Sequence, residues 1–192
     1  PRRDFKVGPN AVTQLAAAIE AHCGTAMADA VFAAGDHFTM RLNPPHAMIP
    51  QTAAIKVHRA LFRLFRVHEA ETIAFDAGLR TGDYLLAHRI PKPAQRVLKV
   101  LPRRLAADLF LSAIARHAWT FAGSGAFSAK RSGDRVMIEI ADNPLATNPC
   151  AWHRGVFTRL FRRLIARHAD VVETQCTGAG APSCRGEIDF AQ

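Results

Sequence analysis

The stretch CAWHRGVFTRLFRRLIARHADVVETQCTGAGAPSCRGEIDF, residues 150–190, decides the fold because its apolar pattern changes period once. In its first half, apolar residues recur at steps of three and four, which predicts an amphipathic helix over residues 152–168. Two short apolar runs follow. They predict strands over residues 171–176 and 185–190, joined by the loop TGAGAPSC.

A β-hairpin is expected before this stretch. Residues 126–130 and 136–140 alternate between apolar and polar positions on either side of a turn that contains Gly133. The C-terminal part is therefore predicted to be a ββαββ unit. The fold class is α+β, with helices packed on a small antiparallel sheet.

The upstream sequence is predicted to be helical. Periodicity and breaker residues predict helices over residues 9–23, 26–38, 51–66, 69–88 and 105–121. The last of these is the most apolar, so we expect it at the centre of the core. The proline-rich NPPHAMIP interrupts the pattern and divides the chain into an N-terminal helical extension, residues 1–45, and a ligand-binding domain, residues 46–192.

Composition and charge restrict the function. With 192 residues, of which 49% are hydrophobic, the chain can bury a core, which excludes general disorder. A formal net charge of +9 favours anionic partners. No recognition-helix, RRM or zinc-finger signature accompanies the charge, so nucleic-acid binding is not predicted. No run is apolar enough for a spanning helix or a signal peptide, and a cytoplasmic protein is expected.

Residues 89–104 concentrate the positive charge. They hold six basic residues and no acid, and prolines bound a short amphipathic helix among them. This segment is predicted to contact a membrane surface or an acidic partner.

The cysteines are the clearest lead to a site. Three of the four, Cys150, Cys176 and Cys184, fall within the last 43 residues, and Glu173 stands three positions before Cys176. None of the spacings forms a CxxC knuckle, so spacing alone leaves a metal site, buried free thiols and a disulfide open. The fourth, Cys23, is predicted to be a buried free thiol.

The run from residue 150 to residue 190 resembles the ending of the 4-vinyl reductase domain family. That ending pairs a cysteine before a helix with an E-x-x-C strand motif and a glycine-containing loop. Related sensor domains bind zinc through three cysteines and one glutamate in this pattern. The resemblance therefore implies a zinc site formed by Cys150, Glu173, Cys176 and Cys184.

Within this family the chain looks most similar to the branch of bacteriochlorophyll biosynthesis. The resemblance implies an accessory protein that binds or carries a magnesium tetrapyrrole, a porphyrin or chlorophyllide intermediate. Magnesium chelatase or the next pathway enzyme would be its partner. It would lie in the cytoplasm or on the inner face of the photosynthetic membrane, as a monomer or a homodimer.

Two other functions stay open at this stage. The family name implies reduction of an 8-vinyl group, but the sequence has no GxGxxG after a strand, no P-loop and no iron–sulfur spacing. The third interpretation is a domain that senses a small aromatic molecule.

The ligand is expected between residues 105–121 and the hairpin. The resemblance places a ligand-facing histidine at His117, where a neutral imidazole would be an axial ligand for magnesium. The other candidate contacts are Arg116, Trp119, Phe121 and Phe127, with the arginine pairing with a propionate. The alternative for His117 is a purely structural role at a helix end, where histidine favours the helix dipole.

Overall fold

A computed structural model describes residues 5–191. Two strands and the first helices come first along the chain: β1 (Lys6–Val7), α1 (Asn10–Cys23), α2 (Thr25–Ala34), α3 (Phe38–Leu42), β2 (Ile49–Pro50), α4 (Gln51–Leu64) and α5 (Val67–His88). They are followed by α6 (Lys92–Val100), α7 (Arg103–His117), α8 (Trp119–Ala122), β3 (Ala126–Ser132), β4 (Arg135–Ala141), α9 (Ala151–Leu164), β5 (Val171–Gln175), a 3₁₀ turn (Thr177–Ala179) and β6 (Ser183–Asp189).

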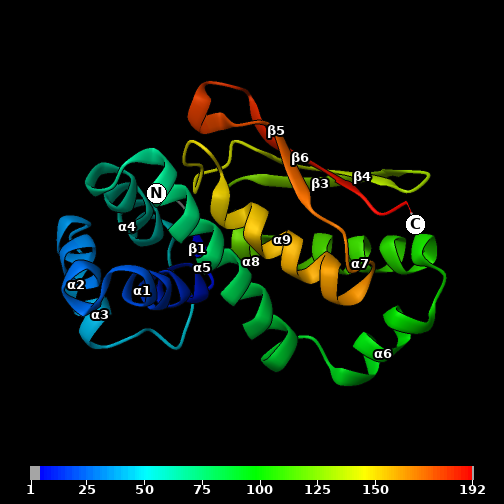
Figure 1. Ribbon diagram of the computed structural model, residues 1–192, viewed down its shortest axis with the longest axis horizontal. Helices are drawn as coiled ribbons and strands as arrows, with labels where there is room; N and C mark the ends of the chain where they lie inside the picture. The colour runs from blue at the N-terminus through cyan, green and yellow to red at the C-terminus, as the bar shows by residue number, and fades with distance from the viewer. Residues whose placement is uncertain (1–4, 192) are drawn as a thin grey trace.

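The main sheet has four antiparallel strands in the order β3-β4-β6-β5. Its first hairpin turns at Gly133, whose positive φ of 61° suits glycine. In Figure 1 the sheet lies over α9, and α5 lies on the other side of that helix. The predicted α+β fold and ββαββ unit are confirmed.

The centre of the molecule is the tight pair of helices α5 and α9. Gly78 of α5 faces Gly155 of α9, and a Cβ built on Gly78 would lie 2.8 Å from the Cα of Gly155. Trp152 adds a hydrogen bond from its indole Nε1 to the Thr81 hydroxyl at 3.2 Å. The glycines of α5 therefore allow backbone contact, because any side chain would separate the two helices.

The N-terminal helices share this core. β1 pairs with β2 across the predicted boundary at residue 45, and α1 packs on α5. One continuous apolar cluster includes residues from β1 at one end of the chain to β6 at the other. The division into an extension and a domain stays a prediction.

Three expectations about helices and burial were wrong. The segment 105–121 does not form the centre, because α7 buries one face while Leu105 and Leu109 are exposed on the other. The segment 26–38 ends early at Ala34, and α3 follows separately. Cys23 is exposed because it lies in the last turn of α1, beyond the buried part of that helix.

None of the helices between residues 5 and 191 combines the length and the apolar character needed to cross a bilayer.

Candidate metal centre

Three elements of the ββαββ unit each bring one cysteine to the same place. Cys150 stands directly before α9, Cys176 directly after β5, and Cys184 at the start of β6. Since β5 and β6 are antiparallel neighbours, the end of one lies beside the start of the other. The fold thus gathers residues that are 26 and 34 positions apart in the sequence.

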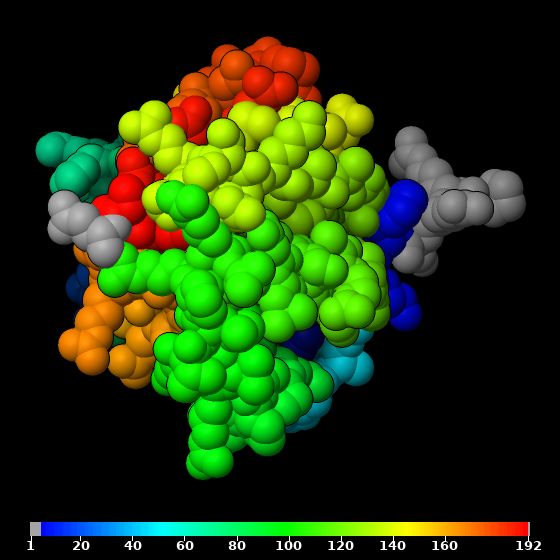
Figure 2. Space-filling view, turned by 90° about the vertical axis from the view of Figure 1, so that its right-hand side faces the viewer, coloured from blue at the N-terminus to red at the C-terminus, as the bar shows by residue number. Residues whose placement is uncertain are grey.

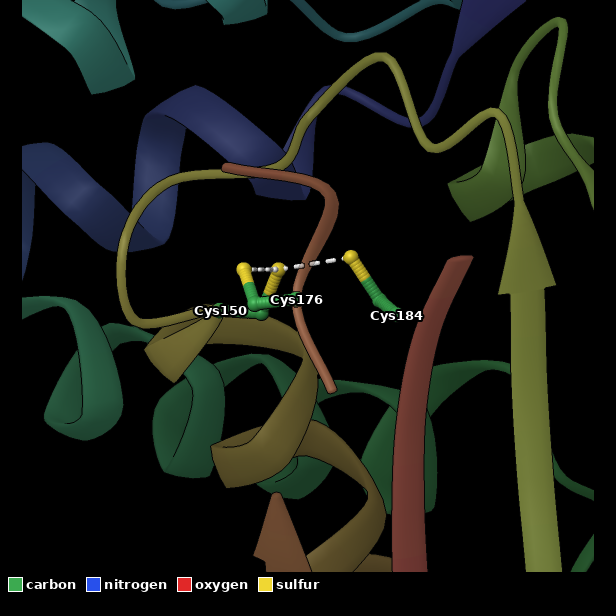
Figure 3. A group of neighbouring side chains, drawn as sticks. All are labelled: Cys150, Cys176 and Cys184. Carbon is green, nitrogen blue, oxygen red and sulfur yellow. Dashed lines mark hydrogen bonds between the residues drawn. The ribbon is translucent and has the colours of Figure 1, made fainter. Parts of the chain in front are cut away.

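The three side chains point toward one another (Figure 3). The Sγ atom of Cys150 lies 2.9 Å from that of Cys184 and 3.2 Å from that of Cys176. These distances are longer than a disulfide bond, and all three residues are free cysteines. All three sulfur atoms lie within 4.8 Å of one another and are buried, so the cluster could hold a metal ion.

The sulfur atoms share their protons unequally. Hydrogen bonds from Cys150 and Cys176 lower the pKa of Cys184, and Thr177 lowers it further through its backbone N–H, 3.4 Å from Sγ. Hydrogen bonds with Cys176 and Cys184 raise the pKa of Cys150. Three thiolates this close repel one another, so the cluster alone favours one thiolate, whereas a divalent cation stabilises three.

Asn143 supports the sulfur atoms from the loop after β4. Its side-chain oxygen accepts the backbone N–H of Leu145 at 3.1 Å, which orients its Nδ2 toward the cluster. From there Nδ2 donates to Cys184 Sγ at 3.3 Å and lies 3.9 Å from Cys150 Sγ. An N–H donor of this kind stabilises a thiolate and fixes its position.

Glu173 lies beside the cluster but not among its three closest ligand atoms. Its Oε2 accepts the backbone N–H of Cys150 at 2.8 Å, so the carboxylate is tied to the segment that carries the first cysteine. Burial raises its pKa, and the bond from Cys150 opposes the shift. A cavity of about 30 Å³, a volume comparable to one water molecule, is lined by Glu173 together with Cys150 and Cys184.

Sequence reasoning missed two neighbours of the site, Asn143 and His153. His153 follows Cys150 by three positions on a helix, which places both on one face, so its spacing could have revealed it. Its Nδ1 lies 3.5 Å from Asn143 Nδ2, and its Nε2 lies 3.3 Å from the carbonyl oxygen of Phe121. Asn143 had no comparable signal, because its role depends on the path of a loop.

Comparison with known proteins identifies the family. A family model of the 4-vinyl reductase domain matches residues 137–190, the segment that holds all three clustered cysteines. The chain is 44% identical to the bacteriochlorophyll synthase 23 kDa chain of Cereibacter sphaeroides over 98% of its own length and 92% of that protein. The chain belongs to the bacteriochlorophyll synthase 23 kDa chain family.

A second member of this family is 38% identical. It is the bacteriochlorophyll synthase 23 kDa chain of Rhodobacter capsulatus, matched over 93% of this chain and 84% of that protein. The resemblance to the 4-vinyl reductase domain family is confirmed by the family-model match over residues 137–190.

Solved structures share the fold of this family member at low identity. An H-NOX protein from K. algicida aligns with a TM-score of 0.63 at 9% identity, covering 97% of both chains. An H-NOX structure concerned with haem distortion aligns with a TM-score of 0.62 at 10% identity, covering 97% of this chain and 96% of that one. These identities show a common fold alone.

The ligand residues predicted for this family member divide into an exposed and a packed group. Arg116, His117 and Trp119 are exposed around the junction of α7 and α8, and Trp119 retains 58% of its surface. Phe121 and Phe127 instead pack into an aromatic cluster with Phe157, with ring centroids 5.5–6.0 Å apart. The five residues are neighbours along one turn of chain, and within residues 5–191 they line neither the cavity at Glu173 nor the one beside α4.

The exposed histidine has a defined ring orientation. His117 Nδ1 lies 3.1 Å from the carbonyl oxygen of Ala113. A carbonyl oxygen can only accept, so Nδ1 is the donor and the neutral ring carries its lone pair on Nε2.

Proposed function

We propose that the cluster is a structural zinc site with Glu173 as its fourth ligand. Three thiolates and one carboxylate suit tetrahedral Zn²⁺, which is softer than the cations that all-oxygen sites select. Cys150, Cys176 and Cys184 would supply the sulfur atoms. Glu173 can supply Oε1, because Oε2 is occupied by the N–H of Cys150.

Such a site would stabilise the fold rather than catalyse a reaction. Four protein ligands leave no open position for a substrate or a reactive water. The zinc would join the start of α9 to β5 and β6, three elements that otherwise meet only through side-chain packing and the sheet ladder. The N–H groups of Asn143 and Thr177 would orient the Cys184 thiolate.

We further propose that the protein takes part in bacteriochlorophyll biosynthesis as a carrier of a magnesium tetrapyrrole. The observation that carries this proposal is 44% identity over nearly the whole chain to a bacteriochlorophyll synthase 23 kDa chain. The fold is compatible with it, since an aligned H-NOX structure concerns haem, another tetrapyrrole. The carrier would hand a porphyrin or chlorophyllide intermediate to magnesium chelatase or the next pathway enzyme.

The junction of α7 and α8 is the proposed contact for the pigment. His117 would offer Nε2 as an axial ligand to magnesium, because its Nδ1 is engaged with Ala113. Exposed Trp119 offers a flat apolar face beside it, and Arg116 a cation for a propionate. Phe121 and Phe127 would support this surface from behind through their packing on α9.

An assay that separates binding from reduction tests this function. The purified zinc-containing chain is mixed with a divinyl chlorophyllide and either NADPH or reduced ferredoxin. We expect the pigment's absorption spectrum to shift while the 8-vinyl group stays intact. Turnover would identify an 8-vinyl reductase instead, and the absence of both binding and turnover would leave a protein–protein role.

A further inference from the structure

Helix α6 presents three different stripes around its short length. Gln95 and Leu98 are buried and face the protein. Pro93, Val97 and Val100 follow the i, i+4, i+7 spacing of a single helix face and point away from the buried pair. Val97 is 47% and Val100 81% exposed, so this outward stripe is apolar and uncovered.

A basic stripe runs beside the apolar one. Lys92, Arg96 and Lys99 repeat the same i, i+4, i+7 spacing one position earlier, and all three are exposed. None of them forms an ion pair with any residue between 5 and 191. Arg104, at the start of α7, does pair, with Asp134 at 2.8 Å. The charge of α6 is thus unbalanced by the described part of the protein.

Helix α7 extends the same kind of surface. Leu105 and Leu109 lie one turn apart on its outer face and are 57% and 48% exposed. Figure 2 shows α6 and α7, in green, together on one face of the molecule, and Figure 1 shows α6 standing away from the sheet. We define the α6–α7 patch as Lys92, Pro93, Arg96, Val97, Lys99, Val100, Leu105 and Leu109.

We propose that the α6–α7 patch docks on an anionic lipid surface. Its valines and leucines would enter the boundary between head groups and acyl chains. Its lysines and arginine would keep their stems along the apolar layer and their charges at lipid phosphates. The unbalanced cations complement a negative leaflet, and a short helix that projects from the body suits a flat surface better than a groove would. This proposal does not depend on pigment binding.

Vesicle co-sedimentation tests the proposal. The full chain is mixed with vesicles of phosphatidylcholine alone or of phosphatidylcholine with phosphatidylglycerol. We expect binding to the anionic vesicles only. The triple substitution K92Q/R96Q/K99Q should weaken it on the order of 100-fold, because each surface cation contributes roughly five-fold to the partition constant. The apolar variant V97S/V100S should weaken it at least roughly ten-fold.

A matched control removes the same charge elsewhere. Lys56, Arg59 and Arg63 form an exposed basic face on α4, at the other end of the molecule in Figure 1. The variant K56Q/R59Q/R63Q has the same net charge as the α6 triple variant and should bind anionic vesicles nearly as the wild type does. The near-ultraviolet circular dichroism of every variant confirms that it is folded.

Several results would overturn the proposal. One is no sedimentation with anionic vesicles. Another is an equal loss in the α4 control, which would indicate an effect of net charge alone. Unchanged binding of V97S/V100S would exclude insertion of the apolar stripe. Binding to poly-glutamate but not to vesicles would assign the patch to an acidic protein.

Discussion

The substitution Cys184→Ser is the most informative test of the metal centre. It removes the sulfur that receives donors from both Asn143 and Thr177 and that contacts Cys150 at 2.9 Å. A metal that joins Cys150 to Cys184 closes a loop of 34 residues in the unfolded chain. By the loop-closure relation for cross-links, loss of that closure costs about 4 kcal/mol.

This cost is large compared with the stability of an ordinary domain, which is about 5–15 kcal/mol. For a chain of 192 residues it corresponds to a fall in Tm of about 10 °C. Thermal unfolding followed by circular dichroism, with zinc measured by mass spectrometry on the same samples, gives both quantities. A chelator should bring the wild type to the Tm of the variant.

The chain contains its own control. Cys23 is exposed at the end of α1 and lies outside the cluster, so Cys23→Ser should leave both Tm and zinc content unchanged. A Cys184→Ser protein that keeps about one zinc per chain and unfolds within about 2 °C of the wild type would refute the reasoning.

Three further predictions concern the core and the pigment contact. Burial lowers the pKa of His58 from its usual 6.5 to about 4, so between these values only the unfolded state takes up the proton. The free energy of unfolding should therefore fall by up to about 3 kcal/mol as pH drops from 6.5 to 4, and urea titrations of His58→Leu should lack this part of the slope. Identical pH dependence of variant and wild type would contradict this. Gly155→Ala should cost about 1–3 kcal/mol in unfolding experiments, because its Cβ would lie 3.0 Å from the Cα of Gly78, whereas Gly8→Ala meets only ordinary contact and is the control. An unchanged midpoint for Gly155→Ala would mean that α5 and α9 can separate freely. His117→Ala should weaken binding of a magnesium tetrapyrrole more than that of its metal-free form, as measured by fluorescence quenching; equal losses would exclude axial ligation.

The C-terminal unit could be predicted because its local signals agree with the final fold. The period change after α9, the alternation in β3 and β4 and the turn at Gly133 all act over a few residues. The wrong expectations involve contacts between distant parts of the chain. The apolar content of α7 did not reveal that Leu105 and Leu109 face outward, and no local pattern marks the pairing of β1 with β2.

The candidate site followed the same rule. The resemblance pointed to Cys150, Cys176 and Cys184, which the structure gathers into one cluster. Asn143 escaped notice because a single asparagine in a loop has many possible roles, and only the loop's path turns its Nδ2 toward sulfur. Whether His117 and Trp119 form the pigment contact stays a prediction, since it depends on a ligand that a sequence pattern does not contain.

One measurement addresses the central claim most directly, an absorption titration of a magnesium protoporphyrin with the purified chain. The carrier account predicts a saturable spectral shift at one pigment per chain, with the pigment recovered chemically unchanged on extraction. It also predicts that the shift is smaller for His117→Ala. A spectrum that does not change over the titration, or a pigment that returns with its vinyl group reduced, would contradict the account.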